Sequence, residues 1–102
     1  MINNYADLYE TLMNEYGYLW DEWDNESEEK AQLVNSLLKT AEDECHLMES
    51  GDSNFQTLEE VLEAARKKMD AIEGMTGEEA GAEMRYYQRN NMDMPLHYEA
   101  FT

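Results

Sequence analysis

The 102-residue chain contains one cysteine, one proline and five glycines. The single cysteine, Cys45, excludes an intramolecular disulfide and any zinc site built from several cysteines, which is typical of a reducing compartment. Helix breakers and β-branched residues are scarce, so local propensity favours helices over strands. No apolar run approaches the roughly 18 residues that a membrane span needs, and residues 1–10 lack the basic and apolar regions of a signal peptide. The sequence therefore predicts a helical, cytoplasmic protein that does not bind membranes.

Basic residues are the next shortage, with 7 Lys and Arg against 24 Asp and Glu and a formal net charge of -17. Residues 1–29 contain nine carboxylates and no basic residue, and residues 40–65 contain eight carboxylates and again no basic residue. Such a surface repels nucleic-acid phosphates and anionic lipids. A positively charged protein surface is the partner that this charge favours, and direct binding to nucleic acid is not expected. Because crowded carboxylates repel one another, we also expect their pKa values to be raised in the folded state.

Hydrophobic residues nevertheless make up 42% of the chain and recur at helical spacing. The spacing predicts an all-α fold, a small bundle in a single domain over residues 1–102. Three main helices are expected over about 4–24, 27–50 and 57–73, with a shorter helix over about 77–90 and an apolar tail over 91–102. The predicted core residues are Tyr5, Leu8, Tyr9, Leu12, Tyr16, Leu19 and Trp23 in the first helix, Val34, Leu37, Leu38, Ala41, Cys45 and Met48 in the second, and Leu58, Val61, Leu62, Ala65, Met69 and Ile72 in the third.

Several residues mark where these helices begin, end or bend. The expected capping or terminating residues are Asn3 or Asn4, Gly51, Thr57 with Glu60 as a capping box, Gly74, and Thr76 with Glu79 as a second capping box. Gly17 is expected to loosen or bend the first helix. Pro95 opposes regular helix in the tail. The apolar tail residues, including Met94 and Leu96, suit either packing on the bundle or binding in a partner's groove.

The acidic residues of the first two predicted helices are the candidate binding surface. Carboxylates three or four residues apart on a helix have Cβ atoms roughly 5–6 Å apart, and rows from adjacent helices approach the charge density of DNA. Exposed aromatic side chains beside charge are typical interface anchors, and helical phase indicates such a position for Tyr18 and Trp20. The candidate partner-binding residues are Asp7, Glu10, Glu15, Tyr18, Trp20, Asp21, Glu22, Glu42, Asp43 and Glu49.

In size, charge and helical character, the whole chain resembles the small acidic inhibitors of host defence that phages and mobile elements encode. These include DNA mimics of the anti-restriction and anti-CRISPR type. Such inhibitors share no motif or common fold, so no residue role is carried over. The resemblance implies a stoichiometric inhibitor, encoded by a phage, whose acidic face blocks the basic nucleic-acid-binding groove of a host defence or DNA-processing enzyme in the host cytoplasm.

Other functions remain as alternatives. A small helical adaptor or assembly subunit would bind a protein partner through the tail and the surface of Tyr86 and Tyr87, with the acidic residues serving solubility. A homodimer through the long helices is compatible with the sequence if the acidic faces point apart. The spacing of Glu42, Asp43 and His46 corresponds to half of a di-metal site, but a second half is missing. No nucleophile motif or phosphate loop is present, so we expect neither enzymatic activity nor a metal or other cofactor.

Overall fold

Four helices account for most of the chain. The computed structural model describes residues 2–26, 28–53 and 55–96, and within these ranges all side chains except those of residues 19, 20 and 22–26. The helices of this part are α1 (Tyr5–Glu26), α2 (Glu28–Ser50), α3 (Leu58–Glu73) and α4 (Gly77–Arg89), and it contains no strand. The predicted all-α class, with three main helices and a shorter fourth, is confirmed. None of the described helices is long and apolar enough to cross a membrane.

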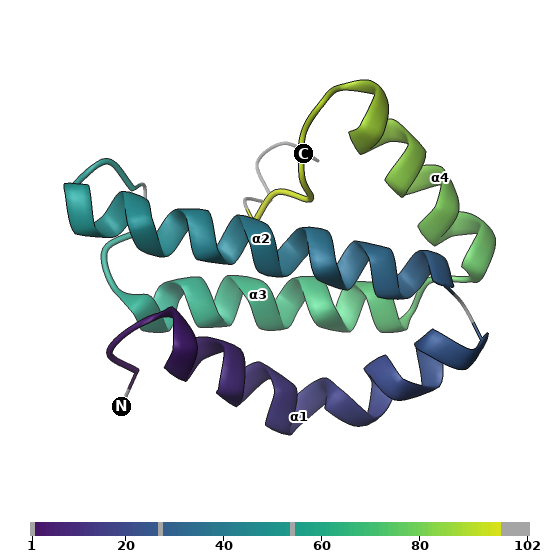
Figure 1. The fold of residues 1–102 in the computed structure, drawn as a ribbon, viewed down its shortest axis with the longest axis horizontal. Coiled ribbons are helices and arrows are strands. Elements are labelled where there is room, and N and C mark those ends of the chain that lie inside the picture. Colours follow the sequence, from purple (N-terminus) through teal and green to yellow (C-terminus); the bar gives the residue numbers. More distant parts are fainter. Residues whose placement is uncertain (1, 27, 54, 97–102) are drawn as a thin grey trace.

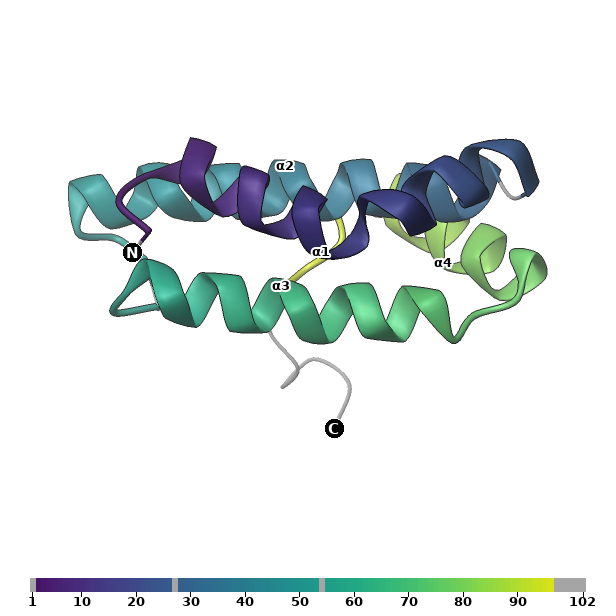
Figure 2. The ribbon, with the colours of Figure 1, turned by 90° about the horizontal axis from the view of Figure 1, so that it is seen from below.

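The helices are arranged around α2, which contacts each of the other three. Helices α2 and α3 run antiparallel to each other, and α1 packs against both of them from one side (Figures 1 and 2). Helix α4 packs on α2 from the opposite side, and the segment that follows α4 returns across the bundle on that side (Figure 1). The outer surfaces of α1 and α4 therefore face in opposite directions.

Helix α2 buries more of its circumference than the predicted core stripe covers. Leu33 and Ser36 are buried together with the predicted core residues of this helix, except Met48, which is partly buried. They lie outside the predicted stripe because α4 and the segment after it cover a second side of α2. The predicted stripes of α1 and α3 are largely confirmed by Leu8, Leu12 and the buried residues of α3, whereas Tyr9 is 38% exposed at the margin. The predicted core side chains at 19 and 23 lie outside the described part.

The helix ends follow the capping signals. The Thr76 hydroxyl accepts from the backbone N–H of Glu79, whose carboxylate accepts from the backbone N–H of Thr76, so this capping box is complete. Thr57 caps α3 in the same way, but the carboxylate of Glu60 accepts from the N–H of Gln56 instead of Thr57. The predicted box of Thr57 and Glu60 is therefore only half formed.

Two helices end in a left-handed residue followed by a backbone reversal. Gly51 after α2 has a φ of 80°, and the N–H of Asp52 donates to the carbonyl of Leu47. Asn91 after α4 has a φ of 52°, and the N–H of Met92 donates to the carbonyl of Tyr87. Both are Schellman motifs, as predicted for Gly51 and found in addition at Asn91. Gly74 is the C-cap of α3, as expected.

The beginning of the tail packs on the bundle. Met94 is 1% exposed and Leu96 is 2% exposed, so both belong to the core. The Ser36 hydroxyl of α2 accepts from the backbone N–H of Met94 at 2.8 Å and lies 3.2 Å from a carboxylate oxygen of Asp93. The open question about the tail is thus settled for its first part in favour of packing. The rest of the predicted tail, residues 97–102, lies outside the described residues.

Helix α1 is bent in its middle, in the part that contains Gly17 (Figure 1). A Cβ atom at Gly17 would have no neighbour within 4 Å. The bend therefore agrees with the expectation from the sequence, and no close approach of another helix requires glycine at this position.

Candidate functional site

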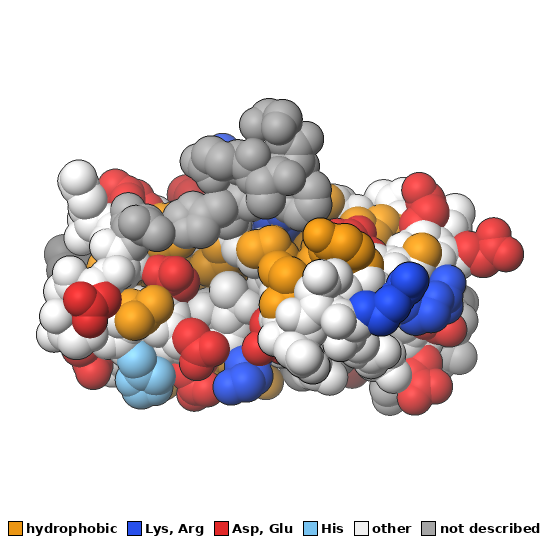
Figure 3. All heavy atoms as spheres, turned by 90° about the horizontal axis from the view of Figure 1, so that it is seen from above, with side chains coloured by type: hydrophobic (Ala, Val, Ile, Leu, Met, Phe, Trp, Pro, Cys, Tyr) orange, Lys and Arg blue, Asp and Glu red, His pale blue; other side chains and the backbone are white. Residues whose placement is uncertain are grey.

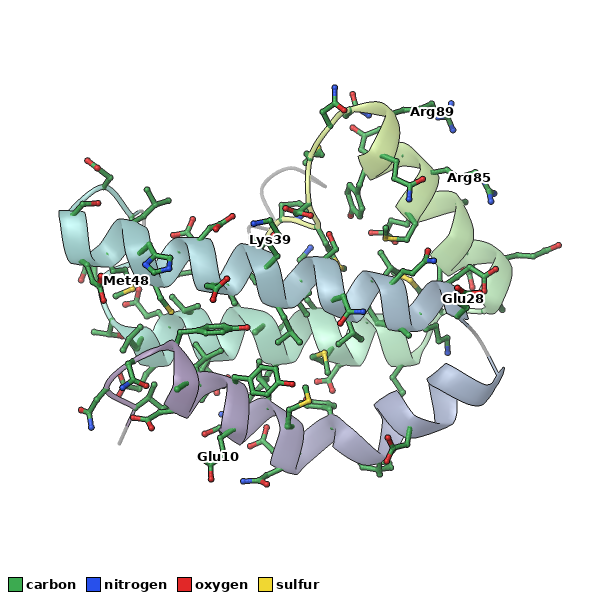
Figure 4. All side chains as sticks on the ribbon, in the orientation of Figure 1. Glu10, Glu28, Lys39, Met48, Arg85 and Arg89 are labelled. Atoms are coloured by element: carbon green, nitrogen blue, oxygen red, sulfur yellow. The ribbon has the colours of Figure 1, made fainter. Side chains whose placement is uncertain are left out.

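The outward face of α1 carries four of the candidate residues. Asp7, Glu10, Tyr18 and Asp21 fall within an arc of about 80° at 3.6 residues per turn. Leu8 and Leu12, on the opposite side of the helix, are fully buried against the bundle. Glu10 points away from the other helices at the outer edge of α1 (Figure 4). These four residues, two before and two after the bend in α1, are called the α1 acidic face below.

Tyr18 is the aromatic residue of the α1 acidic face. Its side chain is 65% exposed, more than any other exposed large hydrophobic side chain in the described part of the chain. This exposure confirms the predicted outward position of Tyr18. The side chains of Trp20 and Glu22, which were predicted to accompany it, lie outside the described part.

Asp7 combines its position on this face with a role in starting α1. Its carboxylate accepts from the backbone N–H of Asn3 at 3.0 Å, and its own backbone N–H donates to the side-chain oxygen of Asn4 at 2.9 Å. Asn4 is thus the N-cap, one of the two predicted residues. Substitution of Asp7 would alter both the charge of the face and the beginning of the helix.

Glu15 lies at the contact between α1 and α3 and is not a free member of the acidic surface. Arg66 of α3 donates from Nε to Oε1 of Glu15 at 2.9 Å and from Nη2 to Oε2, and it also pairs with Glu63. The hydrogen bond from Arg66 lowers the pKa of the Glu15 carboxyl, which is the reverse of the rise expected from crowded carboxylates. Sequence reasoning missed this pair because Arg66 and Glu15 are 51 residues apart.

The candidate residues of α2 lie beside α1 and around the exposed side of α2. Burial first, and the nearby charge of Glu42 second, raise the pKa of Tyr5 on α1 to about 12. The two acidic regions therefore meet where the start of α1 packs against α2. Glu49 is on the same side of α2 as Glu42, with 80% of its side chain exposed and an oxygen 4.0 Å from Nδ1 of His46. Asp43 points about 100° away and lies 3.9 Å from Nζ of Lys39.

A shallow cleft of about 230 Å³ lies beside this meeting point. Its lining residues are Asn3, Asn4, Tyr5, Cys45, His46, Met48, Glu49 and Leu58. Burial and three nearby glutamates raise the pKa of the Cys45 thiol, which disfavours the thiolate that nucleophilic or metal chemistry requires. Across the described side chains, no three His, Cys, Asp or Glu residues gather in a way that could hold a metal ion. The arrangement suits binding through charge and aromatic contact.

Comparison of the chain with models of protein families, with curated proteins and with solved structures gives no match. The structure places Asp7, Glu10, Tyr18 and Asp21 along the outward side of α1 and Glu42 and Glu49 near the start of this helix. It assigns Glu15 and Asp43 to pairs with basic residues.

Proposed function

We propose that this protein is a stoichiometric inhibitor that places the α1 acidic face and the adjoining edge of α2 in the basic nucleic-acid-binding groove of another protein. The observation that carries the proposal is that Asp7, Glu10, Tyr18 and Asp21 share one outward side of a helix. No Lys or Arg of the described part forms an ion pair with Asp7 or Glu10. A basic groove would supply the missing positive charge.

The charge density of α1 indicates which nucleic acid the surface imitates best. Helix α1 has 22 residues and is about 33 Å long at 1.5 Å per residue. Of its seven carboxylates, Asp7, Glu10 and Asp21 lie on the α1 acidic face, whereas Glu15 pairs with Arg66. A DNA duplex carries about 19 charges over that length, whereas a single strand carries about 10 at one per 3.4 Å. The row on α1 is thus closer to a single strand, and duplex density would need the carboxylates of α2 as well.

Tyr18 supports the same interpretation. Grooves that bind single-stranded nucleic acid combine positive charge with aromatic side chains on which bases stack. An exposed tyrosine within a row of carboxylates offers such a groove both a flat aromatic ring and negative charge. We therefore infer that the target groove accepts single-stranded DNA or RNA.

A pull-down of tagged protein from bacterial lysate, at low and high salt, tests the proposal. Captured proteins are identified by mass spectrometry, and excess single-stranded or duplex DNA is added as a competitor. Capture of a nucleic-acid enzyme that single-stranded DNA displaces is the expected result. Capture of partners that are indifferent to both DNAs would count against a groove-blocking inhibitor.

Charge reversal then locates the surface on the purified target. The variant Glu10→Lys/Asp21→Lys/Glu42→Lys removes charge from the α1 acidic face and the edge of α2 without touching the capping residue Asp7. The matched control, Glu28→Lys/Glu59→Lys/Glu73→Lys, changes the net charge equally at exposed positions elsewhere. We expect the first variant to lose at least 100-fold in affinity, because close charge pairs across an interface contribute on the order of a few kcal/mol. The control should lose much less. Equal losses would mean that only net charge matters.

The adaptor alternative keeps one favourable observation. Tyr86 is 55% exposed and Met92 is 42% exposed on the α4 side of the molecule. The part of this alternative in which the tail binds a partner is weakened, because Met94 and Leu96 are buried and are not available to a partner's groove. Deletion of the tail would remove core residues, so substitutions of Tyr86 are the better test of this alternative.

A further inference from the structure

The outward side of α4 carries charges of both signs, in an order that complements an antiparallel copy of the same helix. Glu78, Ala82, Arg85 and Arg89 are all exposed and fall within an arc of about 60° at 3.6 residues per turn. Figure 4 shows Arg85 and Arg89 pointing outward from α4, and Figure 3 shows a patch of basic side chains on the surface seen from above. Helix α4 packs on α2 and leaves this side uncovered in the described part.

The two arginines are not neutralised by the many carboxylates of the chain. The ion pairs of the described residues involve Lys39, His46 and Arg66, and none involves Arg85 or Arg89. Glu29 of α2 is a carboxylate residue close to Arg85. Its Cγ lies 3.3 Å, and Nη1 of Arg85 lies 3.4 Å, from the position that a Cβ on Gly81 would occupy. No ion pair forms there. The positive charge of α4 thus remains available to a partner.

The positions along α4 match an antiparallel copy of the same helix. At 1.5 Å per residue, Glu78 lies about 6 Å before Ala82, and Arg85 and Arg89 lie about 4.5 and about 10.5 Å after it. A two-fold axis next to Ala82 would place Glu78 of one protomer between Arg85 and Arg89 of its partner, and the same contact would form again on the other side of the axis. The small side chain of Ala82 would let the two helices approach closely at the axis.

We propose that two copies of this protein associate through antiparallel pairing of their α4 helices, with Ala82 at the two-fold axis and Glu78 of each protomer bound to Arg85 and Arg89 of the other. Exposed Tyr86, on the flank of the same face, would lose solvent at this interface. The dimer uses the shortest helix, whereas the sequence suggested the long ones. It does not depend on the proposed inhibitory function.

The net charge of -17 on each chain opposes dimerisation through repulsion, and the arrangement of the helices reduces this repulsion. Helices α1 and α4 lie on opposite sides of α2 (Figure 1). Pairing through α4 therefore points the two α1 acidic faces away from each other, and at physiological salt the Debye length of about 8 Å screens charges that are further apart. One helix face of this size gives an interface below about 1,200 Å², so the association is weak.

Analytical ultracentrifugation at 0.15 M salt, over protein concentrations from about 10 μM to about 1 mM, tests the pairing. The wild-type protein should show reversible dimerisation. Glu78→Arg and the double variant Arg85→Glu/Arg89→Glu should each raise the dimer dissociation constant at least tenfold. Lys67→Glu and Glu59→Lys, exposed positions on α3, provide controls that reverse single charges and should dimerise like the wild type.

Mixing the two interface variants gives the decisive result. Glu78→Arg mixed with Arg85→Glu/Arg89→Glu brings opposite charges together at both halves of the interface, so native mass spectrometry should detect a heterodimer in preference to either homodimer. Ala82→Glu, which places two carboxylates at the axis without disturbing a buried group, should also dissociate the dimer while circular dichroism shows unchanged helicity.

Three outcomes would overturn the proposal. They are a wild-type protein that stays monomeric over the whole concentration range, interface variants that dimerise as well as the wild type, and a mixture that forms no heterodimer. If the wild type is monomeric and the arginine variant instead loses binding of an acidic protein, the basic pair serves a different partner.

Discussion

Arg66 of α3 and Glu15 of α1 form a two-point ion pair, with Nε and Nη2 of the guanidinium each donating to a separate carboxylate oxygen. The same guanidinium pairs with Glu63 on its own helix. The contact joins α1, the most acidic helix, to the rest of the bundle through one of the chain's seven Lys and Arg residues. One basic side chain thus offsets two carboxylates at the α1–α3 contact.

This pair gives the stability of the protein a pH dependence of defined sign. Because Arg66 lowers the pKa of Glu15, the pair stabilises the folded state above the unfolded value of about 4.3, and this contribution disappears as the pH falls through the lowered folded value. Both side chains are about one-third exposed, so the contribution at pH 7 is about 1 kcal/mol. Urea unfolding of the wild type and Arg66→Gln should therefore differ at pH 6, and the difference should shrink as the pH falls below about 4.3. Glu63→Gln is the control that keeps the Glu15 contact, and parallel pH curves would contradict the prediction.

The tail should contribute to the stability of the whole bundle. Met94→Ala removes a buried side chain and should lower the free energy of unfolding by about 2–5 kcal/mol. Met92→Ala, two residues earlier at a 42% exposed position, should change it by less than about 0.5 kcal/mol. Ser36→Ala should cost about 1–3 kcal/mol, since it leaves the buried N–H of Met94 without its acceptor. Equal effects of the two methionine substitutions in thermal or urea unfolding would mean that the tail does not pack on α2.

Replacing Gly17 and Gly51 by alanine should change the stability of the protein in opposite directions. Neither Gly17 nor Gly51 has an atom within 4 Å of an added Cβ, so sterics do not distinguish them. Gly17→Ala should stabilise the protein by about 0.5–1 kcal/mol, because alanine is the better helix former. Gly51→Ala should destabilise it by about 1 kcal/mol, because its φ of 80° is unfavourable for a residue with a Cβ. Calorimetry of the two variants checks this, and a loss of stability in Gly17→Ala would show that the bend in α1 is required for folding.

Added salt should stabilise the protein. The net charge of -17 destabilises the folded state through repulsion, and salt screens it. We expect the Tm to rise between about 0.02 and 0.5 M sodium chloride, with the triple variant Glu28→Lys/Glu59→Lys/Glu73→Lys rising less. A Tm that falls with salt would mean that attractive pairs such as Glu15 and Arg66 outweigh the repulsion.

The helices could be predicted from the sequence because their signals are local. Helices α3 and α4 begin at the predicted capping residues Thr57 and Thr76. Helices α2 and α3 end at the predicted residues Gly51 and Gly74. Helical phase likewise predicted the outward position of Tyr18.

Contacts between distant segments were not predictable in the same way. Nothing near Ser36 in the sequence indicates that its hydroxyl will bind the backbone of Met94, and nothing near Arg66 indicates its pair with Glu15. Lys68 is buried although it is a lysine, and burial lowers its pKa. Long, flexible basic side chains reach partners that helical phase alone does not identify.

The central place of α2 has a consequence for how the protein opens. Because α1, α3 and α4 each pack on α2, none of the three can keep its buried side chains covered once α2 unravels. Amide hydrogens in the middle of α2, around Leu37 and Ala41, should therefore exchange with solvent only through global unfolding. The ends of α1 and α4 can fray without exposing that helix, so exchange there should be faster by orders of magnitude.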